Sequence, residues 1–205
     1  MALSKDVVLA FRNSFEDKCY RLLIDAYNKI IFDKINVSTF MENDISAIIN
    51  NNIELNPKSI EWKIYSKTEY PVFNNNQVVE KGFANKQSRI DFVFSVFTSK
   101  KMYKYFIEAK NLKEKYDSGL KKRYIDTGIN SFISKKYENG SLVGYLLNGE
   151  VDNTVLGGIN KLLKKDKRES EILIKKSLPI HNNYYESEHK EIGILKHLIF
   201  DFSNN

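Results

Sequence analysis

Apolar residues recur at three- and four-residue steps in four stretches of the chain, the spacing that places them on one face of an α-helix. This pattern predicts helices over residues 4–34, 40–53, 117–137 and 153–165. Thr39 and Glu42 have the spacing of a capping box at the start of the second helix, and Asp152 is placed to cap the fourth. We interpret each apolar stripe as a face that packs on a core.

Other stretches are short, apolar or alternating, and rich in β-branched and aromatic residues, as is typical of strands. They predict strands over residues 60–65, 88–97, 102–110, 141–147, 172–174 and 194–202. Residues 66–88 are predicted to form a long connection, with a short strand around Val78 and Val79, and residues 177–192 a polar loop. The pattern does not reveal a role for His189 in that loop.

Two of the predicted strands, 88–97 and 102–110, are separated by a short turn at Ser99 and Lys100 and would form a hairpin. If Thr98 pairs with Lys101, then Asp91 lies opposite Glu108, with Cβ atoms roughly 4.5–5.5 Å apart. Lys110 shares a strand face with Glu108, because side chains alternate along a strand. A slip of one residue would separate these groups.

Composition limits the class of protein. The 205 residues are 42% hydrophobic and 28% charged, which is typical of a soluble globular chain and excludes extensive disorder. One cysteine excludes an intramolecular disulfide and a cysteine-based zinc site. We expect no signal peptide and no transmembrane helix, and therefore a cytoplasmic location. The formal net charge of +6 favours polyanionic partners or an anionic membrane surface, and does not by itself choose between them.

Two carboxylates on the same face of a hairpin repel each other unless a cation binds between them. Mg²⁺ prefers oxygen ligands and commonly uses one or two carboxylates. Asp91 and Glu108 would supply these, and the Ala109 carbonyl a third oxygen. Lys110 would then stabilise charge on a phosphate or orient an attacking water. The pattern therefore predicts phosphodiester hydrolysis at a magnesium site.

Asp91 followed by Glu108-Ala109-Lys110, together with the order of the elements, resembles the PD-(D/E)xK nuclease superfamily. The resemblance covers roughly residues 38–147, and the residue before the aspartate is Ile90 where that motif has proline. It implies that Asp91, Glu108 and Lys110 are catalytic. It also implies an acidic residue on the first core helix, either Glu42, which we favour, or Asp44.

The resemblance also implies a fold. We expect an α/β, restriction-endonuclease-like protein with a central mixed sheet of about four to five strands, flanking helices and a long N-terminal helix. Residues 1–205 would form one nuclease-like domain, divided into an N-terminal helical region (1–37), a catalytic core (38–147) and a C-terminal extension (148–205).

The function that the resemblance implies is a Mg²⁺-dependent DNA endonuclease, with Mn²⁺ as an alternative metal, in restriction or anti-phage defence. A homodimer would allow both strands to be cut. Two alternatives stay open: a non-catalytic module that binds nucleic acid or protein, and an RNA-cleaving toxin. Basic residues near the motif are candidates for phosphate contacts: Lys86, Arg89, Lys113, Lys121, Lys122 and Arg123.

Overall fold

The computed structural model describes residues 4–72, 87–98, 101–115 and 118–204. Seven strands form one mixed sheet in the order β1-β2-β3-β4-β7-β6-β5. The strands are β1 (Ile64–Val72), β2 (Ser88–Phe97), β3 (Met102–Lys113), β4 (Gly140–Asn148), β5 (Ile174–Lys175), β6 (Tyr184–His189) and β7 (Gly193–Asp201). The α/β class and the mixed sheet are confirmed, but the sheet has more strands than the four to five predicted.

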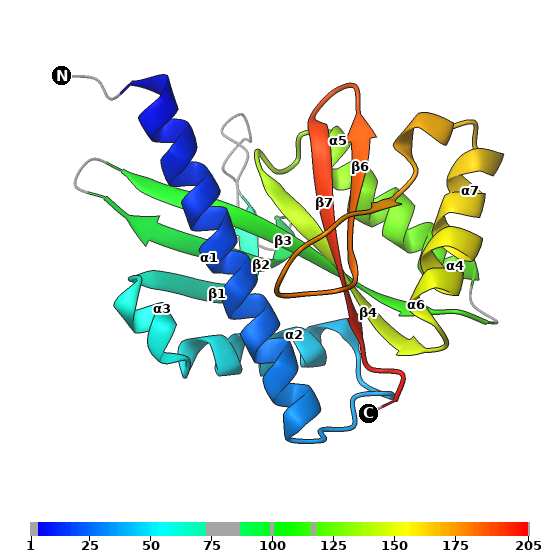
Figure 1. Cartoon of the computed structure of the whole chain (residues 1–205), viewed down its shortest axis with the longest axis horizontal. Coiled ribbons are helices and arrows are strands. Elements are labelled where there is room, and N and C mark those ends of the chain that lie inside the picture. Colours follow the sequence, from blue (N-terminus) through cyan, green and yellow to red (C-terminus); the bar gives the residue numbers. More distant parts are fainter. Residues whose placement is uncertain (1–3, 73–86, 99–100, 116–117, 205) are drawn as a thin grey trace.

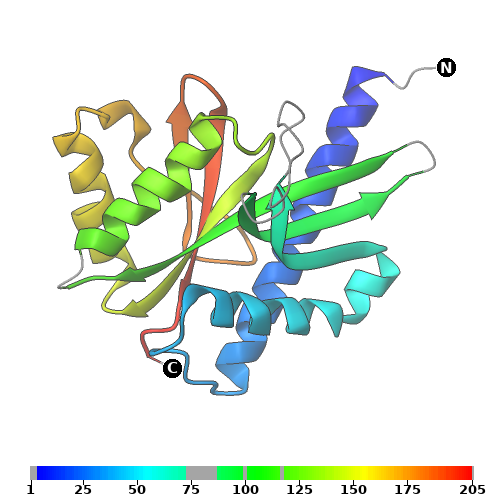
Figure 2. The same cartoon turned by 180° about the vertical axis from the view of Figure 1, so that it is seen from behind.

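Helices cover both faces of this sheet (Figure 1). On one face lie α1 (Lys5–Phe32), α2 (Glu42–Glu54) and the short α3 (Pro57–Glu61). Figure 2 shows the other face, covered by two interrupted helices. These are α4 (Ser118–Arg123), the π-helical turn η2 (Tyr124–Ile129) and α5 (Asn130–Ile133), then α6 (Val151–Thr154), the π-helical turn η3 (Val155–Ile159) and α7 (Asn160–Lys165).

Each layer has its own apolar core. Ile45 and Ile49 of α2 pack with the α1 stripe and with Phe92, Phe94 and Ile107 of the sheet. On the opposite face, the segment from Tyr124 to Phe132 packs on Leu142 and Ile199. The long N-terminal helix is confirmed, and it buries the predicted stripe rather than presenting it to solvent.

The predicted register of the central hairpin is confirmed. Strands β2 and β3 pair antiparallel from Phe92↔Ile107 to Phe97↔Met102. The turn residues 99–100 lie outside the described residues, as does the strand expected around Val78 and Val79. Strand β3 then pairs in parallel with β4 on its other side.

Three local predictions were wrong. The strand predicted over 60–65 begins only at Ile64 and continues to Val72, so the connection predicted from residue 66 is shorter. Residues 57–61 are helical because Pro57 suits a first helical position and the Asn56 side chain accepts a hydrogen bond from the Lys58 amide. The loop predicted over 177–192 contains β6, in which the polar residues Ser187 and His189 are buried.

The predicted helix caps were also wrong. Helix α2 begins at Glu42, and the Asp44 carboxylate accepts a hydrogen bond from the Met41 amide at 3.1 Å. Glu42 is therefore not the third residue of a Thr39 capping box. Asp152 lies inside α6, which Glu150 precedes, and it accepts a hydrogen bond from Tyr185.

Candidate active site

Asp91 and Glu108 lie where the β2–β3 ladder ends. The last pair on that side is Phe92↔Ile107, so the next opposed residues are Asp91 and Glu108. Here the Asp91 carboxylate accepts a hydrogen bond from the Ala109 amide at 2.6 Å. A backbone N–H that has lost its strand partner needs another acceptor, and this side chain supplies it.

Glu42 is held against the same edge of β3 by a second backbone amide. Its Oε2 accepts a hydrogen bond from the Asn111 amide at 2.8 Å, two residues after Ala109. Glu42 is also the first residue of α2, where the helix dipole favours a negative charge. Of the two acidic residues considered for this helix, Glu42 reaches the cluster, whereas Asp44 caps the helix.

The ammonium of Lys110 lies at the centre of these groups. Only 5% of its side chain is exposed. The oxygen atoms around Nζ belong to Ala109 (2.5 Å), Glu108 (2.7 Å), Glu42 (3.2 Å) and Asp91 (3.6 Å). The predicted convergence of Asp91, Glu108 and Lys110 is therefore present, and Glu42 completes it.

Three carboxylates around one ammonium leave a net negative charge in a buried place. Burial raises the pKa of Asp91, and the Glu108 carboxylate raises it further, to about 7. Burial alone would lower the pKa of Lys110, but the charges of Glu108, Asp91 and Glu42 outweigh it and the pKa is raised. Lys110 thus stays cationic, while Asp91 takes up a proton near neutral pH.

Two further side chains contact the carboxylates from the opposite helical layer. Tyr137 donates its hydroxyl to Glu108 Oε2 at 3.1 Å. Burial and the neighbouring Glu108 charge raise the pKa of this hydroxyl, which keeps it a donor. Arg123 donates to Glu42 Oε1 at 3.2 Å. Sequence reasoning placed Arg123 among the phosphate contacts but missed Tyr137, because no periodic pattern links it to Glu108.

A cavity of about 580 Å³ opens beside the cluster. Glu42, Asp91, Asn111, Lys113 and Arg123 are among the residues that line it. The charged residues of its lining are three carboxylates, Glu42, Glu69 and Asp91, and two cations, Lys113 and Arg123. A phosphate group that enters would therefore find cationic side chains beside the carboxylates.

The oxygen-rich lining fits a hard divalent cation. Within the described part of the chain, no three His, Cys, Asp or Glu side chains are already spaced around one metal position. A cation, the Lys110 ammonium, instead occupies the space among the carboxylates. Asn111 lines the same cavity, and its Oδ1 is buried without a hydrogen-bond partner among the described residues. Asp91, Glu108 and the Ala109 carbonyl would hold Mg²⁺ if Lys110 moved aside.

The predicted phosphate contacts do not all lie at this cavity. Lys113 and Arg123 line it, Lys122 is exposed on α4, and Lys86 lies outside the described residues. Arg89 is exposed and lies 3.8 Å from Glu69. Lys121 was a wrong prediction, because it is buried and donates to the carbonyl oxygens of Lys113 and Glu114.

A separate polar network lies inside the second core. Tyr124 is bonded to His197 at 2.8 Å, and His197 to Ser187 at 2.8 Å. Ser187 in turn contacts His189, which contacts Glu171. Burial and the nearby His189 lower the pKa of His197 to about 3. These groups hold β6 and β7 to the helical layer, and Tyr124 does not reach the carboxylates.

No protein-family model matches the chain, and no curated protein or solved structure matches it. Among the described residues, no helix is long and apolar enough to cross a membrane. What the site can do is therefore inferred from its own geometry.

Proposed function

We propose that this chain is a metal-dependent nuclease with a PD-(D/E)xK active site on a restriction-endonuclease-like core, and that DNA is its substrate. The observation that carries the proposal is the set of three carboxylates from α2, β2 and β3 that surround the Lys110 ammonium. Such a set of buried carboxylates is unfavourable without a cation. A protein that binds a metal ion needs carboxylates placed in this way.

A bound Mg²⁺ would polarise a phosphoryl oxygen and make a bound water more acidic. Asp91 and Glu108 would hold it, with the Ala109 carbonyl as a third oxygen ligand. Asp91 has to be ionised for this, and its pKa of about 7 makes metal binding compete with a proton in the neutral range.

Lys110 and Arg123 supply positive charge where a phosphate would develop negative charge. Lys110 is two residues beyond Glu108 on the same strand face. If Mg²⁺ displaced its ammonium from the carboxylates, the ammonium would still lie beside a phosphate bound next to Glu108. Glu42 accepts hydrogen bonds from both cations and thereby orients them. Tyr137 fixes the second oxygen of Glu108 and leaves the first to face the centre of the site.

Cleavage of supercoiled plasmid with Mg²⁺ and with EDTA tests the proposal. We expect Mg²⁺-dependent nicking that Glu108→Gln reduces by at least about a hundredfold, as for loss of a main electrostatic group. Glu61→Gln, an exposed glutamate on α3, is the matched control and should cut as the parent does.

Cutting by Glu108→Gln at the parent rate, or equal cutting in EDTA, would refute the proposed site. If no DNA is cut under any condition, an RNA panel with the same variants decides between an RNA-cleaving enzyme and a non-catalytic binding module.

A further inference from the structure

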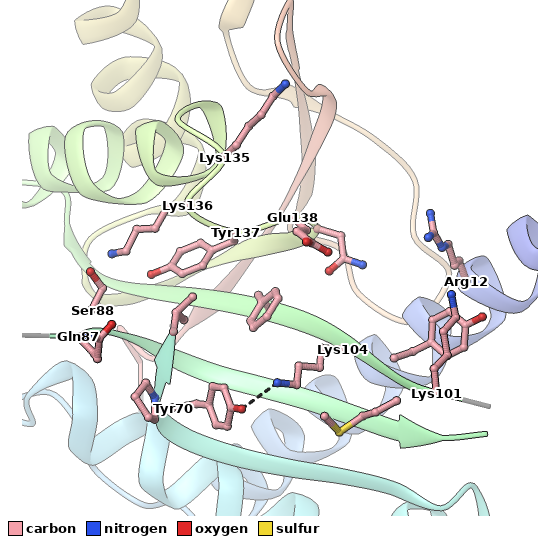
Figure 3. Close-up of a pocket in the computed structure, with 16 residues that line it drawn as sticks. Arg12, Tyr70, Gln87, Ser88, Lys101, Lys104, Lys135, Lys136, Tyr137 and Glu138 are labelled. Atoms are coloured by element: carbon pink, nitrogen blue, oxygen red, sulfur yellow. Dashed lines mark hydrogen bonds between the residues drawn. The ribbon is translucent and has the colours of Figure 1, made fainter. Parts of the chain in front are cut away.

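A second cavity, of about 810 Å³, is lined in part by Tyr137. It runs between the β1–β3 part of the sheet and the segment 135–139 that follows α5. Figure 3 shows Tyr70 and Lys104 on one side of it and Lys136 and Tyr137 on the other. We call it the basic–aromatic groove.

The groove meets the candidate active site directly. Tyr137 lines the groove, and its hydroxyl donates to Glu108 Oε2. Lys104 and Phe106 line it too, and they share a face of β3 with Glu108. From Lys104 to Glu108 is four strand residues, or about 13 Å. A chain lying in the groove would therefore lead to the carboxylates.

The charge of the groove is strongly positive. Among the described lining residues there are five cations, Arg12, Lys101, Lys104, Lys135 and Lys136, and one carboxylate, Glu138. None of these cations is within ion-pair distance of a carboxylate in the described part of the chain. Their charge is thus available to a polyanion.

Aromatic rings alternate with these cations. The ammonium of Lys101 lies 4.5 Å from the Tyr103 ring centroid, and that of Lys104 lies 4.6 Å from the Tyr70 ring. Lys136 lies 5.1 Å from the Tyr137 ring. Tyr70, Tyr103 and Phe106 are half-buried. The Tyr103 ring packs against Phe11, and the Phe106 ring stacks on Tyr137.

We infer that the basic–aromatic groove binds a single-stranded segment of the nucleic acid that the active site cuts, an inference that rests on the proposed function. Cations beside aromatic rings suit a single strand, because its phosphates pair with the lysines while its unpaired bases stack on the rings. In a duplex the base faces are already stacked on neighbouring base pairs, so they are not available to stack on the rings. The substrate class is therefore DNA with a single-stranded region, such as a free end or a junction.

The test is binding, measured by fluorescence anisotropy in EDTA so that no cleavage is needed. The probes are a labelled oligo(dT) and a duplex of the same length. The groove variant is Lys101→Gln/Lys104→Gln/Lys136→Gln. The matched control is Lys161→Gln/Lys164→Gln/Lys165→Gln, three exposed lysines on α7.

We expect the groove variant to bind oligo(dT) about tenfold more weakly or worse, and its salt slope to fall by about two, since each phosphate contact contributes about 0.7 on a single strand. Duplex binding should change by less than about threefold, and the control should match the parent. For stacking, Tyr70→Leu should weaken oligo(dT) binding about fivefold or more, whereas Tyr70→Phe, which keeps the ring, should not.

Unchanged oligo(dT) binding by the groove variant would overturn the inference. So would equal losses for single strand and duplex, or equal losses for Tyr70→Leu and Tyr70→Phe. These failures differ from failure of the nuclease proposal. Plasmid cleavage with no groove-dependent binding refutes only the groove, and groove-dependent binding with no cleavage of any substrate refutes the enzyme.

Discussion

Replacing Asp91 by asparagine is expected to stabilise the metal-free protein at pH 8. The aspartate is ionised at that pH, buried, and surrounded by two other carboxylates. Asparagine has almost the same shape and can still accept the hydrogen bond from the Ala109 amide, which Asp91 accepts at 2.6 Å. It removes the charge and replaces the other carboxylate oxygen by an NH2 group.

The magnitude follows from the pKa of Asp91, which burial and then the Glu108 charge raise from 3.8 to about 7. The folded chain binds the proton more tightly than the unfolded chain, so the stability from this group is full below pH 3.8 and is lost as the pH rises to about 7. At about 1.4 kcal/mol per pKa unit, the free energy of unfolding has fallen by about 1.5 kcal/mol at pH 5, where only the unfolded chain is ionised, and by about 4 kcal/mol at pH 8.

Urea unfolding in EDTA at pH 5 and pH 8 measures this cost. The free energy of unfolding of Asp91→Asn should exceed that of the parent by an amount that grows by about 2.5 kcal/mol between the two pH values. Asp17→Asn, an exposed aspartate on α1, should show no such growth. An Asp91→Asn difference that is zero or independent of pH would refute the reasoning, because it would mean that the carboxylate is not strained in the fold.

Three other predictions concern separate parts of the chain. Lys110→Met leaves three carboxylates without their central cation, so in EDTA it should lower stability by about 3–5 kcal/mol, and millimolar Mg²⁺ should restore much of the melting temperature. A melting temperature that does not change with Mg²⁺ would contradict the idea that Mg²⁺ and the Lys110 ammonium occupy the same position. Gly140→Ala places a Cβ against the Phe106 carbonyl oxygen at a φ of 154° and should lower stability by about 2 kcal/mol or more in urea; a neutral effect would exclude this close approach. His197→Gln should reduce the loss of stability between pH 7 and pH 4 by about 3 kcal/mol. The reason is that burial and His189 lower the pKa of His197 to about 3, so the parent loses stability as the pH falls below 6.5, and an unchanged acid profile would refute this.

Local patterns predicted much of the fold because local forces decide those elements. The α1 stripe, the two hairpin strands and β4 depend on spacing within one segment, and the structure has them close to the predicted bounds. Strand β6 was missed because its polar residues Ser187 and His189 are buried, and they also have hydrogen-bond partners on distant segments, His197 and Glu171. A residue pattern does not report a hydrogen bond to a group that is distant in the sequence.

The same distinction applies to the candidate site. The sequence by itself determined that Asp91, Glu108 and Lys110 lie together, because hairpin register and the two-residue period of strands are local geometry. Only the tertiary structure decided the other members of the cluster. Glu42 reaches Lys110 because packing of Ile45 and Ile49 places the start of α2 at the edge of β3.

Tyr137 reaches Glu108 because the second helical layer returns across the sheet before β4. The groove beside it likewise exists only where that return lies over the first three strands. Neighbouring residues along the chain determine which groups share a strand face. The relative placement of the helical layers and the sheet depends on the packing of the whole core. It determines which side chains from other elements contact those groups.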